Sequence, residues 1–216
     1  ISVSIDTWGI DFAFIDKNGK LMSNPLTYRD PEKSKRNTAK LFKTITEKDF
    51  FNLTGCFATP LAAAFYLEKL VSEDDWELNN AHKILPLSDL FNHFLTGISV
   101  VEYTRAYNML LVNCISKNWE NIIIKEAGFP PDILPDIIDS GEKIGNIQTG
   151  ITKELEIKQF PVVSAAGHDT ASAVAGVPSV SAKYDYAFLS TGTWLVLGAE
   201  AENPIMEYDA TRYLFT

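Results

Sequence analysis

Polar residues interrupt the apolar runs of this sequence at three turns, and these turns are where its side chains could do chemistry. The three stretches are Asp6-Thr7-Trp8-Gly9-Ile10-Asp11, Ala166-Gly167-His168-Asp169-Thr170-Ala171-Ser172 and Ser190-Thr191-Gly192-Thr193. Loops held by rigid elements are where binding and catalytic residues concentrate. We therefore treat each turn as a candidate site and set a purely structural role beside it.

In the first stretch, two acids, a tryptophan and a glycine interrupt an apolar pair of predicted strands. Trp8 beside Gly9 offers a flat face and a close backbone approach to a ligand of the size of a sugar. The structural alternative is a bend in the strand, with Gly9 as a bulge and Trp8 in the core.

The second stretch follows a short apolar run and precedes a predicted helix that starts near Thr170. Asp169 or Thr170 stands where a helix N-cap belongs, so a capping role is the structural alternative. The functional interpretation places Asp169 at the carboxyl end of a strand, close to the first amides of a helix. Ligands of α/β proteins commonly bind at such a position.

The third stretch, 190–193, is a run of small residues between two β-rich segments. Backbone N–H groups in such a turn can converge on an anion, and the hydroxyls add donors. An ordinary hairpin turn explains the same residues.

Other residue types give no comparable signal. The three histidines lack metal-ligand spacing, and Cys56 and Cys114 form no CxxC pair, so we predict that both cysteines are small core residues. The sequence holds neither a Walker-type GxxxxGK[ST] nor a GxGxxG motif, which argues against a P-loop and against a standard dinucleotide site.

The elements that must position these turns follow from apolar spacing and from turn residues. We predict strands near 3–5 and 12–15, with a hairpin turn at Asn18-Gly19, and a polar loop over 29–40. Apolar stripes at helical spacing predict the following helices: 61–70 after Pro60, 87–95 stopped by Gly97, 104–115, and 118–127 ended by Gly128. A strand at 160–163, the helix from 170, and β-rich runs at 184–189 and 194–197 complete the order, which indicates mixed α/β layers.

Composition limits the class of protein. The chain has 216 residues, 46% of them hydrophobic, and a net charge of −9. This balance argues against binding nucleic acid or an anionic membrane surface. Two cysteines and the lack of an apolar run of about 20 residues predict a reduced, cytoplasmic setting. The chain starts without Met and breaks off in an apolar run, so we expect it to be a fragment.

Taken together and in order, these motifs resemble the FGGY family of carbohydrate kinases, and most closely its rhamnulokinase branch. The resemblance spans essentially the whole chain, and its specific stretches are Asp6-Thr7-Trp8-Gly9, His168-Asp169-Thr170-Ala171-Ser172-Ala173-Val174 and Ser190-Thr191-Gly192-Thr193-Trp194. Weaker matches are Tyr28-Arg29-Asp30, Thr54-Gly55, Leu95-Thr96-Gly97 and Glu102-Tyr103-Thr104.

The resemblance implies an α/β, actin-like and ribonuclease-H-like fold, with two domains around a cleft and mixed sheets flanked by helices. It implies that Asp169 is the general base that takes the proton from the primary hydroxyl of a sugar. Gly9, His168 and Thr170 would line the sugar pocket, with Trp8 adjacent.

For the nucleotide, the resemblance implies ATP with Mg²⁺ bridging its phosphates, and contacts to these phosphates from Gly192 and Thr193. Residues 1–180 would be the remainder of the sugar-binding domain, and residues 181–216 the start of the nucleotide-binding domain. The family's first phosphate loop has no counterpart here, so we expect these residues alone to be inactive.

The expected reaction is phosphorylation of L-rhamnulose to its 1-phosphate. L-Fuculose or another ketose is the alternative substrate, because residues 56–64 and Tyr107-Asn108-Met109 depart from the family pattern. A non-catalytic relative that binds carbohydrate or nucleotide is the alternative of a different class.

Overall fold

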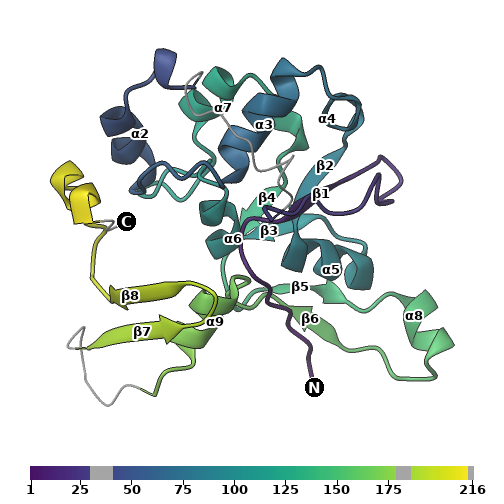
Figure 1. The fold of residues 1–216 in the computed structure, drawn as a ribbon. Helices are drawn as coiled ribbons and strands as arrows, with labels where there is room; N and C mark the ends of the chain where they lie inside the picture. Colours follow the sequence, from purple (N-terminus) through teal and green to yellow (C-terminus); the bar gives the residue numbers. More distant parts are fainter. Residues whose placement is uncertain (30–40, 179–185, 214–216) are drawn as a thin grey trace.

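The computed structural model describes residues 1–29, 41–178 and 186–213, in which helices alternate with short strand pairs (Figure 1). The helices are α2 (Glu47–Thr54), α3 (Ala63–Ser72), α4 (Trp76–Asn80), α5 (Leu87–Thr96), α6 (Tyr103–Asn108), α7 (Asn121–Ala127), α8 (Thr149–Glu154) and α9 (Asp169–Ala175). The strands are β1 (Phe12–Ile15), β2 (Lys83–Pro86), β3 (Val100–Glu102), β4 (Asp136–Ile138), β5 (Lys143–Asn146), β6 (Pro161–Val163), β7 (Ala187–Thr191) and β8 (Leu195–Ala199). Three short 3-10 helices are η1 (Leu41–Lys43), η2 (Pro131–Ile133) and η3 (Tyr208–Tyr213).

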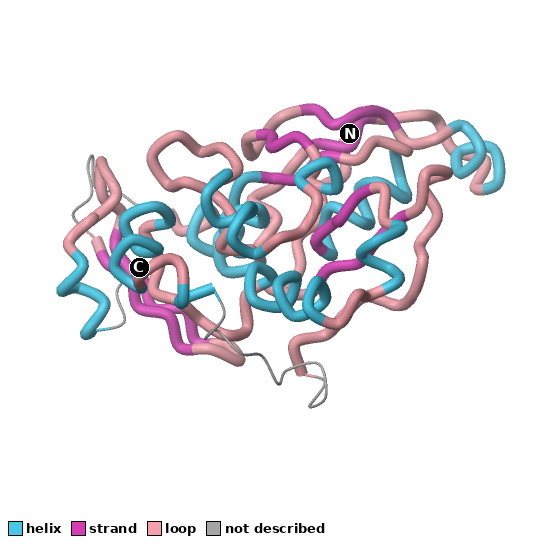
Figure 2. Tube along the Cα trace, turned by 90° about the horizontal axis from the view of Figure 1, so that it is seen from above, coloured by secondary structure: helices cyan, strands magenta, loops and turns pink. Residues whose placement is uncertain are grey.

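Within the described ranges the strands pair two by two. The pairs β1–β2, β5–β6 and β7–β8 are antiparallel, whereas β3–β4 is parallel. The N-terminal segment adds parallel bridges from Val3 to Val162 and from Thr7 to His168. The predicted mixture of strand directions is therefore confirmed, and Figure 2 shows the β7–β8 hairpin close to the C-terminus at one side of the molecule.

The largest hydrophobic core lies around α3, with α2 and α7 beside it (Figure 1). Phe65 of α3 and Phe50 of α2 are fully buried, and their ring centroids lie 5.8 Å apart. Complete burial of one such side chain stabilises the fold by about 1.5–3 kcal/mol. The strand β1 is buried on both faces, which explains its continuous apolar sequence.

Glycines end the helices where the sequence predicts it. Gly97 closes α5 with φ 78°, and Gly128 closes α7 with φ 81°, a left-handed conformation that glycine adopts at little cost. The hairpin at Asn18-Gly19 is also confirmed. There the Asp16 carboxylate accepts hydrogen bonds from the backbone N–H groups of Asn18 and Lys20, both at 2.8 Å.

Three predicted helices have different bounds, and one of them, predicted over 118–127, begins only at Asn121 as α7. The helix predicted over 104–115 is only α6, because Leu110 has φ 58° and turns the chain toward a bridge between Val112 and Trp119. The helix after Pro60 begins at Ala63, so Pro60 does not occupy its first turn. The predicted polar loop over 29–40 and the start of the run at 184–189 lie largely outside the described residues.

Candidate functional site

Two of the three candidate turns lie side by side. Thr7 N–H donates to the carbonyl of Gly167 at 3.0 Å, and Asp169 N–H donates to the carbonyl of Thr7 at 2.9 Å. This parallel pairing sets Trp8 and Gly9 directly beside His168 and Asp169. Residues far apart in the sequence thus form one site at the start of α9.

Asp169 is the first residue of α9, and its side chain is 55% exposed. The N-cap is His168, without a capping bond from its side chain, so the prediction of Asp169 or Thr170 as N-cap is wrong. The N–H of Asp169, which has no partner within the helix, is bonded to Thr7 O, and its Oδ1 accepts the N–H of Thr170 at 2.7 Å. Its other oxygen remains accessible to a ligand.

Trp8 lies at the surface rather than in the core, with 51% of its area exposed. Its indole Nε1 donates to Asp11 Oδ2 at 2.8 Å. The structural alternative, a core tryptophan beside a bulge, is therefore wrong. The bend is instead a tight turn in which Asp11 N–H donates to Gly9 O at 3.0 Å and Ile10 has φ 78°. A β-branched residue in that conformation costs about 1–3 kcal/mol, a strain that is typical of functional sites.

Gly9 allows side chains to approach its backbone closely. A Cβ atom at this position would lie 2.4 Å from Asn108 Oδ1 and 2.9 Å from His168 Nε2. Both distances are shorter than those that real Cβ atoms show, so a side chain at this position would displace the tips of Asn108 and His168.

The imidazole of His168 lies beside the carboxylate of Asp169, with Nε2 3.6 Å from Asp169 Oδ1. Burial lowers the pKa of His168, although the neighbouring Asp169 opposes this effect. The imidazole is therefore neutral at pH 7, and it presents one N–H donor and one acceptor.

A buried carboxylate, to which the sequence analysis assigns no role, accepts hydrogen bonds from this turn. Glu102 is buried, and its Oε2 accepts the N–H of Gly167 at 2.9 Å. The hydroxyl of Thr104 donates to the same oxygen, and it accepts the N–H of His168 at 3.4 Å. The motif Glu102-Tyr103-Thr104 thus connects α6 to the turn that carries Asp169.

Arg105 is the other residue that sequence reasoning missed. Its side chain is 1% exposed, its Nη1 donates to Trp8 O at 2.7 Å and its Nη2 to Asp11 O at 3.4 Å. Burial lowers the pKa of Arg105 and raises the pKa of the nearby Asp89 to about 7, against the attraction between the two groups. No local pattern marks a buried arginine, because its environment comes from distant segments.

The third candidate turn stays separate from this cluster. Gly192 and Thr193 lie in the exposed turn of the β7–β8 hairpin, so the hairpin itself is confirmed. Strand β7 contacts α9 (Figure 1). Among the described residues, no hydrogen bond joins this turn to Asp169. A Cβ at Gly192 would meet nothing within 4 Å, so the turn is open to a ligand from outside.

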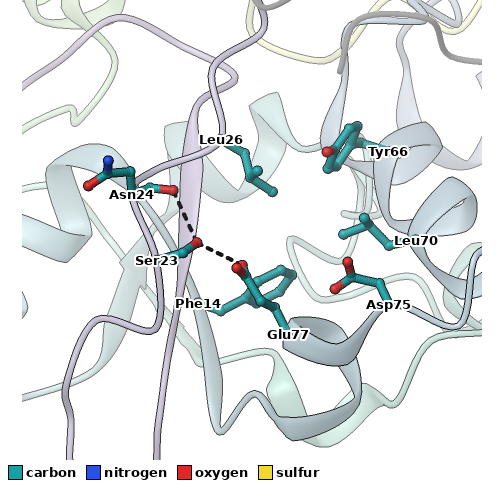
Figure 3. Close-up of a pocket in the computed structure, with 8 residues that line it drawn as sticks. All are labelled: Phe14, Ser23, Asn24, Leu26, Tyr66, Leu70, Asp75 and Glu77. Carbon is teal, nitrogen blue, oxygen red and sulfur yellow. Dashed lines mark hydrogen bonds between the residues drawn. The ribbon is translucent and has the colours of Figure 1, made fainter. Parts of the chain in front are cut away.

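A pocket of about 340 Å³ lies away from the Asp169 cluster, between the segment after β1 and the helices α3 and α4 (Figure 3). Its lining residues are Phe14, Ser23, Asn24, Leu26, Tyr66, Leu70, Asp75 and Glu77. Both carboxylates are already engaged, since Asp75 caps α4 and Glu77 accepts the Ser23 hydroxyl at 2.8 Å. We therefore assign it no part in the site.

Three further findings concern metals, thiols and membranes. Over residues 1–29, 41–178 and 186–213, no group of three or more His, Cys, Asp or Glu side chains is placed to hold a metal ion. Cys56 and Cys114 are buried thiols, as predicted. Within the same ranges, no helix has the length and the apolar character needed to cross a membrane.

The fold defines the class of protein. The structure is similar to a xyloylose kinase from Brucella ovis (TM-score 0.74, 19% identity, covering 91% of this chain and 39% of that one). It is equally similar to a carbohydrate kinase from Novosphingobium aromaticivorans (TM-score 0.74, 23% identity, covering 95% and 44%). These likenesses confirm the predicted actin-like fold of sugar kinases.

The sequence then defines the family. Residues 1–176 match the N-terminal domain of the FGGY family of carbohydrate kinases, and the chain belongs to this family. Curated relatives include the rhamnulokinases of Bacteroides thetaiotaomicron (34% identity, 100% of this chain and 44% of the relative) and Oceanobacillus iheyensis (32% identity, 100% and 45%). The chain thus spans less than half the length of these relatives.

Proposed function

We propose that the full-length protein transfers the γ-phosphoryl group of ATP to the primary hydroxyl of a deoxyketose, and that this ketose is L-rhamnulose. One observation carries the proposal. The exposed carboxylate of Asp169 is held beside His168 and the bare backbone of Gly9 by the hydrogen bonds of Thr7. The rhamnulokinase relatives support the choice of sugar.

In the proposed reaction, Asp169 accepts the proton of the sugar hydroxyl while the hydroxyl oxygen forms a bond to the γ-phosphorus. The bond from this phosphorus to the bridging oxygen of ADP breaks, and ADP leaves. Phosphoryl transfer depends mainly on positioning and on charge stabilisation. Acid–base assistance of this kind is typically worth about 10²–10⁴-fold in rate.

Sugar binding is assigned to the groups around Asp169. Gly9 lets the sugar approach the backbone, neutral His168 supplies one donor and one acceptor, and Thr170 adds a hydroxyl. The exposed indole of Trp8 offers a flat apolar face to the carbon skeleton.

For the nucleotide, we propose that the open turn at Gly192 and Thr193 contacts the phosphates. Mg²⁺ would neutralise charge on these phosphates. We also propose a domain boundary near residue 180, between the sugar-binding part and the start of the nucleotide-binding part, and a cytoplasmic location.

Asp169→Asn in the full-length protein tests the assignment. The change keeps the shape and the bond from Thr170 N–H, so we expect normal folding and a fall in kcat of about 10²–10⁴-fold. The assay is ADP release with Mg-ATP and a panel of ketoses that includes L-rhamnulose and L-fuculose. Near-normal turnover by the variant would remove Asp169 from the mechanism.

The same panel separates the alternatives. A preference for L-fuculose would keep the mechanism and change the substrate. If folded wild-type protein releases no ADP with any sugar of the panel, the result would favour a relative that binds carbohydrate or nucleotide without catalysis. We expect residues 1–216 alone to be inactive.

A further inference from the structure

Asn108 projects a polar side chain into the same space as His168. Its Oδ1 would lie 2.4 Å from a Cβ at Gly9, and His168 Nε2 would lie 2.9 Å from that same position. Both side-chain tips therefore border the bare backbone of Gly9, next to Asp169. Asn108 belongs to α6, whereas His168 precedes α9, so two different elements contribute the side chains that border the site.

The helix that carries Asn108 is tied to the site at several points. At its start, Glu102 bonds the backbone of Gly167, and Arg105 donates to Trp8 O at 2.7 Å. Just after its end, Met109 O accepts the N–H of Ala64 at 3.0 Å. Asn108 is therefore held by backbone and buried contacts rather than by its own side chain.

The Asn108 amide is half-buried and makes no hydrogen bond to another described residue. A partly buried amide prefers a partner, and it carries both a donor and an acceptor. A sugar hydroxyl is likewise both donor and acceptor. An amide fixed beside the proposed base is thus complementary to a hydroxyl other than the one that reacts.

We propose that Asn108 binds a non-reacting hydroxyl of the ketose and sets the preference between ketose epimers. The inference rests on the proposed function, since it names a specificity residue of that site. L-Rhamnulose and L-fuculose differ only in the configuration of one hydroxyl-bearing carbon, so an amide at a fixed position favours one of them. A site built to hydrogen-bond a hydroxyl discriminates more strongly than an apolar pocket does.

The test compares full-length wild-type protein with Asn108→Ala and Asn108→Asp. Asn80→Ala is the matched control, because Asn80 is an exposed residue of α4 that bonds Trp76 O. Two readouts are needed for L-rhamnulose and L-fuculose: kcat and KM with Mg-ATP, and sugar affinity by calorimetry without nucleotide.

Asn108→Ala is expected to raise KM and Kd for the preferred ketose about 3- to 10-fold, the effect of one hydrogen bond. Asn108→Ala should also bring the kcat/KM values for the two sugars closer together. The value of kcat should change less than KM, because Asp169 is intact. Asn108→Asp should weaken binding too, since it loses the N–H₂ donor, and Asn80→Ala should match the wild type.

Each other outcome is decisive. If both Asn108 variants keep the wild-type KM and epimer ratio within twofold, the inference is wrong and the kinase function stands. If wild-type protein binds a ketose through Asn108 but never transfers phosphate, the inference stands and the kinase function is wrong. If wild-type protein binds neither sugar, both are wrong.

Discussion

At the scale of single residues, the site depends on groups whose neighbours determine what they can do. The backbone of Gly9 is not in the left-handed region. The residue matters because a side chain here would occupy the space that the tips of Asn108 and His168 fill. His168 is neutral because burial lowers its pKa. Asp169 stays exposed at the helix start, so its carboxylate can reach a ligand.

Gly9→Ala should damage sugar binding more than folding. The new methyl group would collide with the tips of Asn108 and His168, and both tips can turn away. We expect KM for the ketose to rise about 10-fold or more, with a change in unfolding free energy below about 1 kcal/mol. Steady-state kinetics and urea unfolding measure the two effects. An unchanged KM would contradict the close approach seen at this position.

Asp89→Asn should change how stability depends on pH. The unfolded carboxyl loses its proton near pH 4, whereas burial raises the folded pKa of Asp89 to about 7. Between these values the folded state holds the extra proton, so wild-type stability falls as pH rises, by at most about 1.4 kcal/mol per pH unit. Above pH 7 this contribution is constant.

Urea unfolding at pH 5, 6, 7 and 8 measures this slope. The control variant is Asp209→Asn, because the carboxylate of Asp209 is 81% exposed. Asp89→Asn should flatten the curve between pH 5 and 7, and the control should keep the wild-type slope. Equal slopes in all three proteins would show that Asp89 does not titrate in this range.

At the scale of elements, α6 organises the site although it contains none of the proposed catalytic groups. Its N-cap Glu102 accepts hydrogen bonds from Gly167, in the turn that precedes Asp169, and from the Ser140 hydroxyl. Arg105, one turn later, holds the bend after Trp8. A helix of six residues thus fixes the two segments that carry Gly9 and Asp169.

Glu102→Ala should lower both stability and activity. It removes a helix cap and leaves the buried N–H of Gly167 without its acceptor, at a cost of about 2–4 kcal/mol. Because the turn before Asp169 loses its support, kcat should fall as well. Glu120→Ala is the matched control, since Glu120 caps α7 through Ile122 N–H but does not contact the turn.

The control should lose stability and keep its kinetic constants. If Glu102→Ala behaves in the same way, α6 stabilises the fold without positioning the turn that carries Asp169. Thermal unfolding and the ADP-release assay, run on the same preparations, give both readouts.

At the scale of the whole molecule, the largest contribution to stability is expected from the core around α3. Phe65 is completely buried among aromatic side chains, whereas Phe94 of α5 is 38% exposed. Phe65→Ala should lower the unfolding free energy by about 3–5 kcal/mol, because it removes apolar burial and leaves a cavity. Phe94→Ala should cost less than about 1 kcal/mol. Equal losses in urea unfolding would contradict the position of the core.

Local features of this molecule were predictable from sequence because they depend on a few neighbouring residues. Gly97 and Gly128 stop helices through their own backbone freedom, and Asn18-Gly19 makes a hairpin turn through side-chain and backbone bonds within five residues. The strand β6, the helix after His168 and the β7–β8 hairpin were found for the same reason. The family resemblance also came from contiguous motifs.

What the sequence alone determined, then, is the family, the candidate turns and most of the elements, since each is encoded by local spacing. The tertiary structure alone decided which turns meet. The pairing of Thr7 with His168 joins segments separated by most of the chain, and the N-cap of the adjoining helix is His168 rather than Asp169. The sequence could not predict three further features: the burial of Arg105, the exposure of Trp8 and the approach of Asn108 to Gly9. The physical reason is the same for each, because long-range packing sets the environment of a side chain and local propensity does not encode it.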